Sequence, residues 1–369
     1  MINNRAVGEG KKLSSLQSRI FKPAEGHTYA HHAFLAFFKG YFYAMWSCGI
    51  VHEDDPGQGI MISRSRDAIE WEKPHFIATP DMLGDDMLVL TAGGLYVSGD
   101  TLKAYFGQYR YTEESLEGGR TRVGKKVVQE DTGLWVISTR DGEIWDAPRR
   151  LGIALAPNHG PHPTHSGRLI FPGGVMFAYT DDRAGEKNLI PAGIYGDTFG
   201  NGEPMDSSGH IRRVTEFRGW NAPLICEGSF FQTDDGVIHM MLRSNSDRLW
   251  CSESRDDGET WSDPFPTDYS DDGSKHHFGR LPDGRFYGVN NAVWNRVRSP
   301  LDLYLSRDGE NFDEHFIIRD EDRQKLFEGC GKRGVYGYPH TLIHENTLYV
   351  IYSVNKEMIE VSIIPLHQL

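Results

Sequence analysis

The sequence has few cysteines and no long apolar run. Its four cysteines, at positions 48, 226, 251 and 330 of 369 residues, include no Cys-x-x-Cys pair. This spacing argues against a disulfide framework, and we expect reduced thiols. No stretch approaches the roughly 20 apolar residues of a membrane span, and the N-terminal segment lacks the apolar core of a secretory signal. We therefore expect a soluble, cytoplasmic protein, or a secreted one if a signal has been removed.

Basic residues are also in short supply. The chain has 39 Lys and Arg against 52 Asp and Glu, for a formal net charge of −13. Nucleic acids and anionic membranes attract clustered Lys and Arg, so we expect neither as a partner, and an anionic ligand would need a local basic pocket. Long runs of helix formers are missing too, whereas 41 glycines and 12% aromatic residues favour short strands and tight turns.

A short motif is repeated along the chain. Each copy has a Ser or Thr, an Asp two residues later and an aromatic residue further on, and the copies occupy residues 65–71, 139–145, 254–261 and 306–312. In a hairpin turn such an Asp accepts backbone N–H bonds, Gly takes positive φ and the aromatic side chain packs beneath. The motif therefore predicts a structural role, away from the chemistry.

The copy at 254–261, Ser-Arg-Asp-Asp-Gly-Glu-Thr-Trp, resembles the Asp-box of sialidases at every defined position. The other three copies resemble it with one residue deleted. Alternating apolar stretches precede each copy, so the repeat unit is three strands, the turn and a fourth strand, which is one propeller blade. We expect an all-β fold, a six-bladed β-propeller of four-stranded antiparallel blades in a single sialidase-like domain over residues 1–369. The blades are placed at about 28–79, 86–152, 157–216, 222–268, 273–320 and 334–366.

This blade arrangement has three irregularities. The third blade shows no recognisable box, and the second carries a charged insertion at 112–130, which predicts a surface loop or lid. The last blade shows only three strands. A stretch near residues 19–22 is expected to supply the fourth and close the ring, since closure removes exposed sheet edges.

Ionisable side chains recur where the first strand of each blade begins. The innermost strands of a propeller line its axis, so residues at their starts gather around one mouth. Those with titratable side chains are His31, His32, His162, His165, Glu227, His276, His277, Tyr338 and His340. Such groups suit substrate binding and proton transfer. No pair on one strand has the spacing of a zinc site, so we predict no metal and no other cofactor, although histidines from separate blades could still combine.

The second half of the chain resembles sialidases in its chemistry as well. Glu227 and Arg243, in the segment LICEGSFFQTDDGVIHMMLRS, are similar to that family's catalytic Glu and one Arg of its carboxylate-binding triad. Arg296 or Arg298 stands where a second triad Arg would be, and Tyr338 where the nucleophilic Tyr would be. The resemblance implies that Glu227 takes the proton of Tyr338, whose neutral phenol does not repel an anionic sugar.

The first half departs from the family. Asp54 and Asp55 lie near the place of the family's acid/base Asp, with a solvated acidic loop as the alternative. The Arg-Ile-Pro motif that supplies the first triad Arg is absent. That region holds Lys22, His27, His31 and His32. Lys and neutral His cannot reproduce the bidentate bonds of a guanidinium to a carboxylate, which counts against sialic acid as the substrate.

Three functions fit these patterns. The leading hypothesis is an exo-acting glycoside hydrolase on a terminal carboxylated sugar, with Tyr338 and Glu227 at the anomeric carbon. The alternative is a propeller polysaccharide lyase that cleaves a uronic-acid linkage, such as a rhamnose–glucuronate linkage, with His32, His277 or His340 in proton transfer. A third is a non-catalytic glycan-binding propeller. Aromatic candidates for sugar stacking are Trp46, Tyr109, Trp220 and Trp294.

Overall fold

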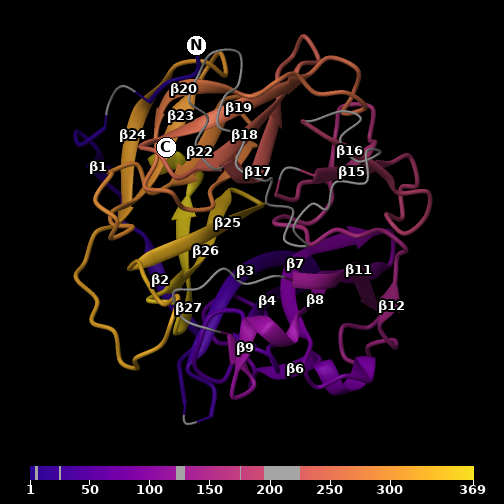
Figure 1. The fold of residues 1–369 in the computed structure, drawn as a ribbon. Coiled ribbons are helices and arrows are strands. Elements are labelled where there is room, and N and C mark those ends of the chain that lie inside the picture. Colours follow the sequence, from indigo (N-terminus) through magenta and orange to yellow (C-terminus); the bar gives the residue numbers. More distant parts are fainter. Residues whose placement is uncertain (5–6, 25, 122–128, 175, 195–224) are drawn as a thin grey trace.

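Six sheets of four or five strands surround a common axis in the computed structural model, which describes residues 1–4, 7–24, 26–121, 129–174, 176–194 and 225–369 (Figure 1). Within these residues helical structure is limited to short 3-10 turns, such as Pro80–Leu83. No helix there has the length and apolar character that crossing a membrane requires. The predicted all-β, six-bladed fold is confirmed.

The first three blades follow one another along the chain as antiparallel sheets. The first consists of β3 (Tyr29–Phe38), β4 (Tyr41–Gly49), β5 (Gly59–Ser65) and β6 (His75–Ala78). The second consists of β7 (Val89–Ser98), β8 (Thr101–Tyr111), β11 (Gln129–Thr139) and β12 (Arg149–Arg150). The third consists of β13 (His162–Pro163), β14 (Leu169–Phe171), β15 (Met176–Thr180) and β16 (Ile190–Gly193). The predicted remainder of this blade, up to residue 216, lies outside the described residues.

The last three blades complete the ring. The fourth consists of β17 (Ile225–Gln232), β18 (Ile238–Ser244), β19 (Arg248–Ser254) and β20 (Phe265–Ser270). The fifth contains β21 (His277–Arg280), β22 (Phe286–Asn290), β23 (Leu301–Ser306) and β24 (Phe312–Arg319). The sixth contains β25 (Tyr336–His344), β26 (Thr347–Val354) and β27 (Met358–Pro365).

The N-terminal segment joins both the fifth and the sixth blade. The strand β2 (Leu16–Phe21) pairs antiparallel with β27, so the predicted closing strand is confirmed, and the indigo β2 lies beside the yellow β27 in Figure 1. The strand β1 (Lys11–Lys12) runs parallel to β24 and gives the fifth blade a fifth strand, which the sequence pattern did not predict. The N-terminal segment thereby covers one edge of each of these two sheets, which would otherwise be exposed.

The repeated motifs form the turns between the third and fourth strands of their blades. Asp67 accepts the backbone N–H groups of Ile69 at 2.8 Å and Glu70 at 2.9 Å, and Trp71 packs over the turn with its Nε1–H donating to Ala68 O. Asp141, Asp256 and Asp308 accept backbone N–H groups in the same way. The predicted turn role of the Asp is confirmed in these four copies.

The third blade also has an Asp in this turn, and here the sequence-based prediction was wrong. Asp182 follows β15 and accepts N–H groups from Ala184, Glu186 and Lys187 at 3.0–3.1 Å, while its own N–H donates to Thr180 Oγ1. This copy escaped detection because the turn is longer and lacks the aromatic residue. The hydrogen bonds of this turn need only the Thr180 hydroxyl and the carboxylate of Asp182, two residues later.

The charged insertion of the second blade lies between β8 and β11. It begins with a 3-10 turn at Glu113–Ser115 and a small hairpin of β9 (Leu116–Glu117) and β10 (Arg120–Thr121). Gln129 and Glu130, predicted to end the loop, already belong to β11 and pair with Tyr111 and Arg110. Residues 122–128 lie outside the described part of the chain.

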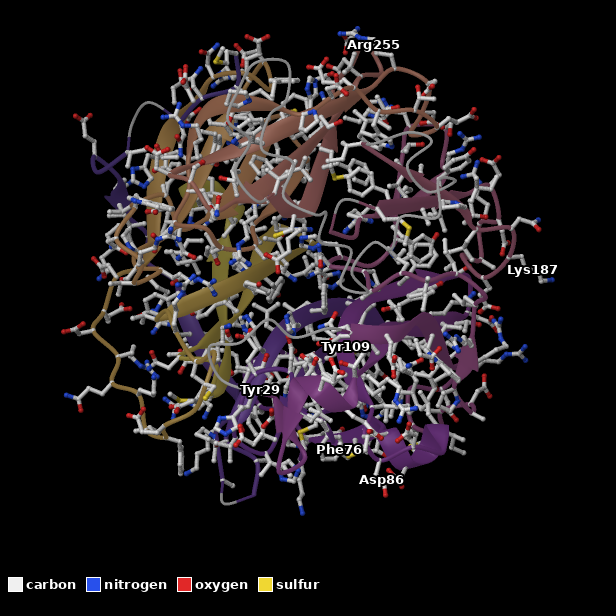
Figure 2. All side chains as sticks on the ribbon, in the orientation of Figure 1. Tyr29, Phe76, Asp86, Tyr109, Lys187 and Arg255 are labelled. Carbon is white, nitrogen blue, oxygen red and sulfur yellow. The ribbon has the colours of Figure 1, made fainter. Side chains whose placement is uncertain are left out.

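Apolar side chains fill the space between neighbouring blades. Trp46 is fully buried where the first blade packs against the sixth, and Tyr109 is 4% exposed. Figure 2 shows Tyr29 and Tyr109 in the interior and Arg255 and Lys187 at the periphery. Burial leaves neither Trp46 nor Tyr109 free to stack on a sugar, contrary to expectation. Trp220 lies outside the described residues.

Candidate active site

Three inner strands carry a bulge at the residue expected to face the axis. The pairing register shifts around His32 in β3, Glu227 in β17 and Tyr338 in β25. These residues have φ of 53°, 53° and 57°, in the left-handed region that non-glycine residues rarely adopt. A bulge re-aims the side chain out of the regular alternation, at a strain of about 1–3 kcal/mol each. Strain repeated on three separate blades points to a functional requirement.

Glu227 and Tyr338 meet across the axis, as the sequence predicted. The Tyr338 hydroxyl donates a hydrogen bond to Glu227 Oε1. Arg243, on β18, donates from Nη1 to Glu227 Oε2 at 2.5 Å and to the Tyr338 oxygen at 2.8 Å. The three side chains, from the fourth and sixth blades, therefore form one hydrogen-bonded group.

The surroundings of this group shift the pKa values of Glu227 and Tyr338 in opposite directions. Burial by itself would raise the pKa of Glu227, but the Arg243 guanidinium and the Tyr338 hydroxyl lower it to about 2. Burial raises the pKa of Tyr338 well above its ordinary value, although Arg243 acts in the opposite direction. At neutral pH the resting pair is thus a carboxylate that accepts a hydrogen bond from a neutral phenol.

Four basic side chains surround the Tyr338 ring, although burial lowers the pKa of Lys275 to about 7 and also lowers that of Lys356. Arg243 and Arg298 lie 6.0 and 5.4 Å from the ring centroid, and the Nζ atoms of Lys275 and Lys356 lie 5.3 and 5.9 Å from it. These positive charges stabilise negative charge on the phenol oxygen whenever its proton leaves. The surroundings of Tyr338 therefore suit a nucleophile.

The guanidinium of Arg298 has nitrogen atoms available to bind an anion. Its side chain is buried, and Nη2 donates to Gly273 O at 3.3 Å, whereas Nε and Nη1 have no hydrogen-bond partner among the residues that the structure describes. The backbone is held from behind, since Asp272 Oδ2 accepts the Arg298 N–H at 2.8 Å. A buried guanidinium with two unpartnered nitrogens needs an anion, and a carboxylate fits it.

Of the two candidates for the second triad position, only Arg298 lines the pocket. Arg296 instead stacks on the Trp294 ring, with its guanidinium carbon 3.7 Å from the centroid, and donates to Asn245 O. The two residues are separated by one position in the sequence, and the loop conformation alone sends their side chains different ways.

A central pocket of about 540 Å³ contains this group. Its lining residues are His32, Glu53, Asp54, Glu227, Arg243, Gly329, Gly331, Arg298, Lys332, Arg333, Tyr338 and Lys356. Five of them are basic and three acidic, so the pocket is locally positive in a chain of net charge −13. The basic pocket that an anionic ligand would require is therefore present.

Asp54 lines the pocket and Asp55 does not. Burial and the neighbouring Glu53 raise the pKa of Asp54 to about 7, against the opposing effects of Lys356 and Gln58. Gln58 holds this carboxylate by donating from Nε2 to Oδ1 at 3.3 Å. A carboxyl group that is half protonated near neutral pH is suited to general acid and base catalysis.

Several lining residues escaped the sequence reasoning. Glu53 accepts a hydrogen bond from Lys356 Nζ, and the backbone of Lys356 is fixed where its carbonyl accepts the Ala30 N–H at 2.9 Å. Arg333 is exposed in the glycine-rich loop that precedes β25. The Lys-Arg pair in GCGKRG, directly before the Tyr338 strand, was the signal that could have found it.

Five of the predicted histidines divide into three places. His32 lines the pocket, and His31 is buried behind it, with its ring 4.1 Å from that of Tyr338. His277 and His340 lie outside the lining in a separate cluster, with ring centroids 4.5 Å apart. His165 is exposed, and its backbone N–H donates to Gln232 Oε1. The structure thus brings His31 and His32, but not the other three, to Tyr338.

Two groups of described residues could hold a metal ion by proximity. One consists of His31, His32 and Glu53 at the pocket, where the Glu53 carboxylate is already paired with Lys356. The other consists of His159, His162, His277 and His340. In the group at the pocket, the ammonium group of Lys356 therefore already occupies the Glu53 carboxylate.

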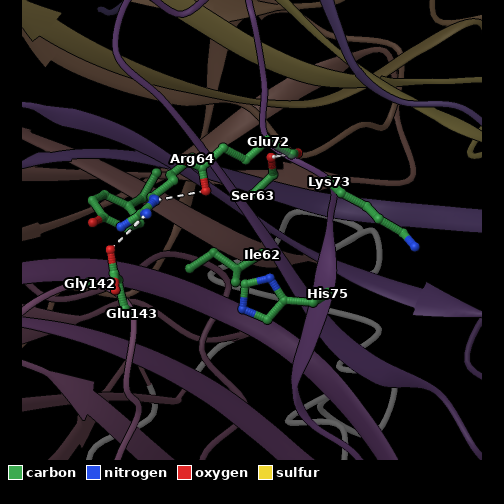
Figure 3. Close-up of a pocket in the computed structure, with 9 residues that line it drawn as sticks. Ile62, Ser63, Arg64, Glu72, Lys73, His75, Gly142 and Glu143 are labelled. Atoms are coloured by element: carbon green, nitrogen blue, oxygen red, sulfur yellow. Dashed lines mark hydrogen bonds and ion pairs between the residues drawn. The ribbon is translucent and has the colours of Figure 1, made fainter.

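A second, smaller pocket lies away from the axis, between the first and second blades. It has a volume of about 170 Å³, and Arg64 crosses it to bond Glu72 at 2.9 Å and Glu143 at 3.0 Å (Figure 3). Because both carboxylates satisfy this guanidinium, Arg64 is not available to bind an anionic ligand. This contrast with Arg298 singles out the central pocket.

The fold and the central pocket together define a sialidase-like propeller. Residues 40–351 match the family described as BNR repeat-like domain, and the chain belongs to this family. A comparison with curated proteins found no significant match.

Solved structures of sialidases share the fold at low sequence identity. A structure titled "Sialidase" is 18% identical with a TM-score of 0.66, and the match covers 97% of this chain and 33% of that one, so this chain spans about a third of its length. An intramolecular trans-sialidase from Ruminococcus gnavus is 12% identical with a TM-score of 0.64, covering 95% and 98% of the two chains. A Dyadobacter fermentans protein of unknown function is 14% identical with a TM-score of 0.67, covering 96% and 98%.

Proposed function

We propose that this protein is an exo-acting glycoside hydrolase that removes a terminal carboxylated sugar. The observation that carries the proposal is the hydrogen-bonded group of Tyr338, Glu227 and Arg243 inside a positively charged pocket. A pocket of about 540 Å³ suits the end of a glycan better than a long stretch of polysaccharide. The sialidase-like fold supports the reaction class.

In the first step the Tyr338 oxygen attacks the anomeric carbon while its proton passes to Glu227. The glycosidic C–O bond breaks, and Asp54 donates a proton to the leaving oxygen. In the second step Asp54 takes a proton from water, which displaces Tyr338 from the sugar, and Glu227 returns its proton to the phenol oxygen. Two displacements at one carbon give net retention of configuration.

Substrate binding itself would strengthen the base. Glu227 has a pKa of about 2 because Arg243 holds it, which makes it a weak proton acceptor in the resting pocket. A substrate carboxylate between Arg298 and Arg243 would draw the Arg243 N–H groups away from Glu227. The pKa of Glu227 would then rise, and proton transfer from Tyr338 would become easier once a carboxylated sugar is in place.

The geometry favours hydrolysis over β-elimination. A lyase would rely on histidines beside the sugar, yet His277 and His340 lie outside the pocket lining and His32 is the remaining candidate. Burial also lowers the pKa of His32 well below its ordinary value, which makes it a weak base. Tyr338 and Glu227, in contrast, are in direct contact.

The test is a screen of sialosides, glucuronides, rhamnosyl-glucuronides and neutral aryl glycosides, with product analysis. We expect turnover of a carboxylated substrate with a saturated product. A fluorinated analogue of that substrate should label Tyr338, as detected by peptide mass spectrometry. An unsaturated product absorbing in the near ultraviolet would show a lyase instead. Binding without turnover would show a glycan-binding propeller, and turnover of neutral sugars alone would refute the role of the basic pocket.

A further inference from the structure

Four histidines form a cluster on the inner strands, outside the lining of the central pocket. We call His159, His162, His277 and His340 the axial histidine cluster. They come from the connection before β13, from β13, from β21 and from β25, and their candidate ligand atoms all lie within 4.8 Å of one another. Three of the four side chains are buried and that of His162 is half-buried. The proposed hydrolysis uses none of them.

His159 and His162 each have a ring nitrogen with no hydrogen-bond partner among the described residues. The Nε2 atom of His159 lies 3.0 Å from the carbonyl oxygen of His276, so it carries the ring proton and Nδ1 keeps its lone pair. Within the described part of the chain, that Nδ1 atom is buried with no hydrogen-bond partner, and so is Nε2 of His162. Buried nitrogen atoms without a partner, aimed into one cluster of imidazoles, are what a site for a cation provides.

His277 and His340 differ in what they can offer. Nδ1 of His277 lies 2.7 Å from Thr341 Oγ1, and with its proton donated to that oxygen the ring keeps a lone pair on Nε2. Nδ1 of His340 instead accepts the backbone N–H of Leu35 at 3.3 Å, so the neutral ring carries its proton on Nε2. In these tautomers His159 and His277 offer lone pairs, His162 offers an Nε2 atom, and His340 offers a donor.

We propose that the axial histidine cluster binds one divalent transition-metal ion through His159, His162 and His277. Imidazole nitrogen favours Zn²⁺ and its neighbours in the first row over Mg²⁺ or Ca²⁺. His340 is placed to donate from Nε2 to a water molecule or anion in the fourth position. Carbonyl and hydroxyl oxygens bonded to the opposite ring nitrogens of His159 and His277 orient the ligands, as in known zinc sites.

The site needs little rearrangement. Ligand atoms about 2.0–2.1 Å from a tetrahedral ion are about 3.4 Å apart. The candidate ligand atoms lie within 4.8 Å of one another, so the widest pair has to approach by at most about 1.4 Å. A basic side chain lies nearby: Lys275 Nζ donates to Asn158 O at 2.9 Å and lies 4.4 Å from the centroid of the Phe34 ring. Phe34 in turn packs edge-on against His159 and His340, so its ring borders both the ammonium group and the cluster.

The experiment is a titration of the purified, chelator-treated 369-residue chain with Zn²⁺ against a chromophoric competitor. We expect one ion per chain, and Co²⁺ substitution should give the visible absorption of a tetrahedral nitrogen site. His159→Gln and His277→Gln should each weaken binding at least about a hundredfold, and His340→Gln about tenfold, because it removes only a donor to the fourth ligand. His165→Gln is the matched control, since this exposed histidine lies three residues from His162.

Folding is monitored separately by circular dichroism and by the melting temperature. Zn²⁺ should raise the melting temperature of the wild type and of His165→Gln but not of His159→Gln. If a fully buried variant fails to fold, His162→Gln replaces it, because that side chain is half-buried. Equal Zn²⁺ affinity of the wild type and the folded ligand variants would overturn the proposal, as would a loss of binding in His165→Gln. Neither outcome bears on the hydrolase reaction, which uses other residues.

Discussion

Two sets of carboxylates in this molecule have lowered pKa values for different reasons. In the blade turns, Asp67 and Asp308 are stabilised by backbone N–H groups two and three residues away. In the central pocket, Glu227 is stabilised by Arg243 and by Tyr338, which is 111 residues away along the chain. The turns are local constructions that serve the scaffold, whereas the pocket depends on closure of the ring. Substitutions in the two sets should therefore separate stability from activity.

The largest effect is expected at Tyr338. Tyr338→Phe removes the proposed nucleophile and should lower kcat by about a thousandfold or more, with a melting temperature close to that of the wild type. Glu227→Gln should have a similar effect on kcat, because it removes the proton acceptor. The measurements are kcat and thermal unfolding on the best substrate of the screen.

The matched control for Tyr338 lies two residues earlier on the same strand. The Tyr336 hydroxyl donates to Glu321 O at 2.8 Å and lies outside the pocket lining. Tyr336→Phe should reduce stability by about 1 kcal/mol and leave kcat unchanged. Near-normal turnover in Tyr338→Phe and Glu227→Gln would contradict the division between pocket and scaffold.

The next largest effect concerns Asp54 and pH. Its pKa of about 7 means that the protonated form, which the first step requires, disappears as the pH rises through 7. We expect kcat/KM to fall on that alkaline limb and Asp54→Asn to lower it by about a hundredfold. Substrates with good leaving groups should be affected least, because they need no proton. An alkaline limb that persists in Asp54→Asn would assign it to another group.

A smaller effect is expected at Arg298. Arg298→Gln should raise KM for the carboxylated substrate by about tenfold to a hundredfold, the range of a lost charge-assisted hydrogen bond, and should change kcat less. Stability should not decrease, since Nε and Nη1 have no hydrogen-bond partner in the described part of the chain. Arg296→Gln, whose guanidinium stacks on Trp294, should leave KM unchanged. Equal KM changes in the two variants would refute the assignment of Arg298.

The smallest effect is expected in the turns. Asp308→Ala should lower the free energy of unfolding by about 1–2 kcal/mol at neutral pH without changing kcat. Because backbone N–H groups lower the folded-state pKa of Asp308, its contribution is present above about pH 4 and is lost as the pH falls further. The difference in melting temperature between wild type and variant should therefore shrink below pH 4. A difference that grows on acidification would exclude this linkage.

The sequence predicted four of the blade turns and the closing strand, but it did not predict the turn of the third blade. Four turns and the closing strand β2 could be identified because their signals lie within a few residues or in a gap of the repeat. The turn at Asp182 was missed because the motif was defined with an aromatic residue, which the hydrogen bonds of this turn do not need. A pattern based on bonding partners would have found it.

Pocket residues that belong to no repeat could not be predicted in this way. Glu53 and Lys356 are 303 residues apart and form an ion pair only because the first and sixth blades are neighbours in the closed ring. Likewise, the resemblance suggested Arg296 and Arg298 equally, and the loop conformation held by Asp272 decided between them.

By itself, then, the sequence determined the blade repeat, the turns and the meeting of Glu227, Arg243 and Tyr338 at the axis. These follow from short-range periodicity and from a resemblance confined to a few motifs. The tertiary structure alone decided which charges face the pocket, that Asp54 rather than Asp55 lines it, and that His277 and His340 join His159 and His162 outside it. The physical reason is that burial and electrostatic partnership depend on bulges and on contacts between blades, which no local pattern encodes.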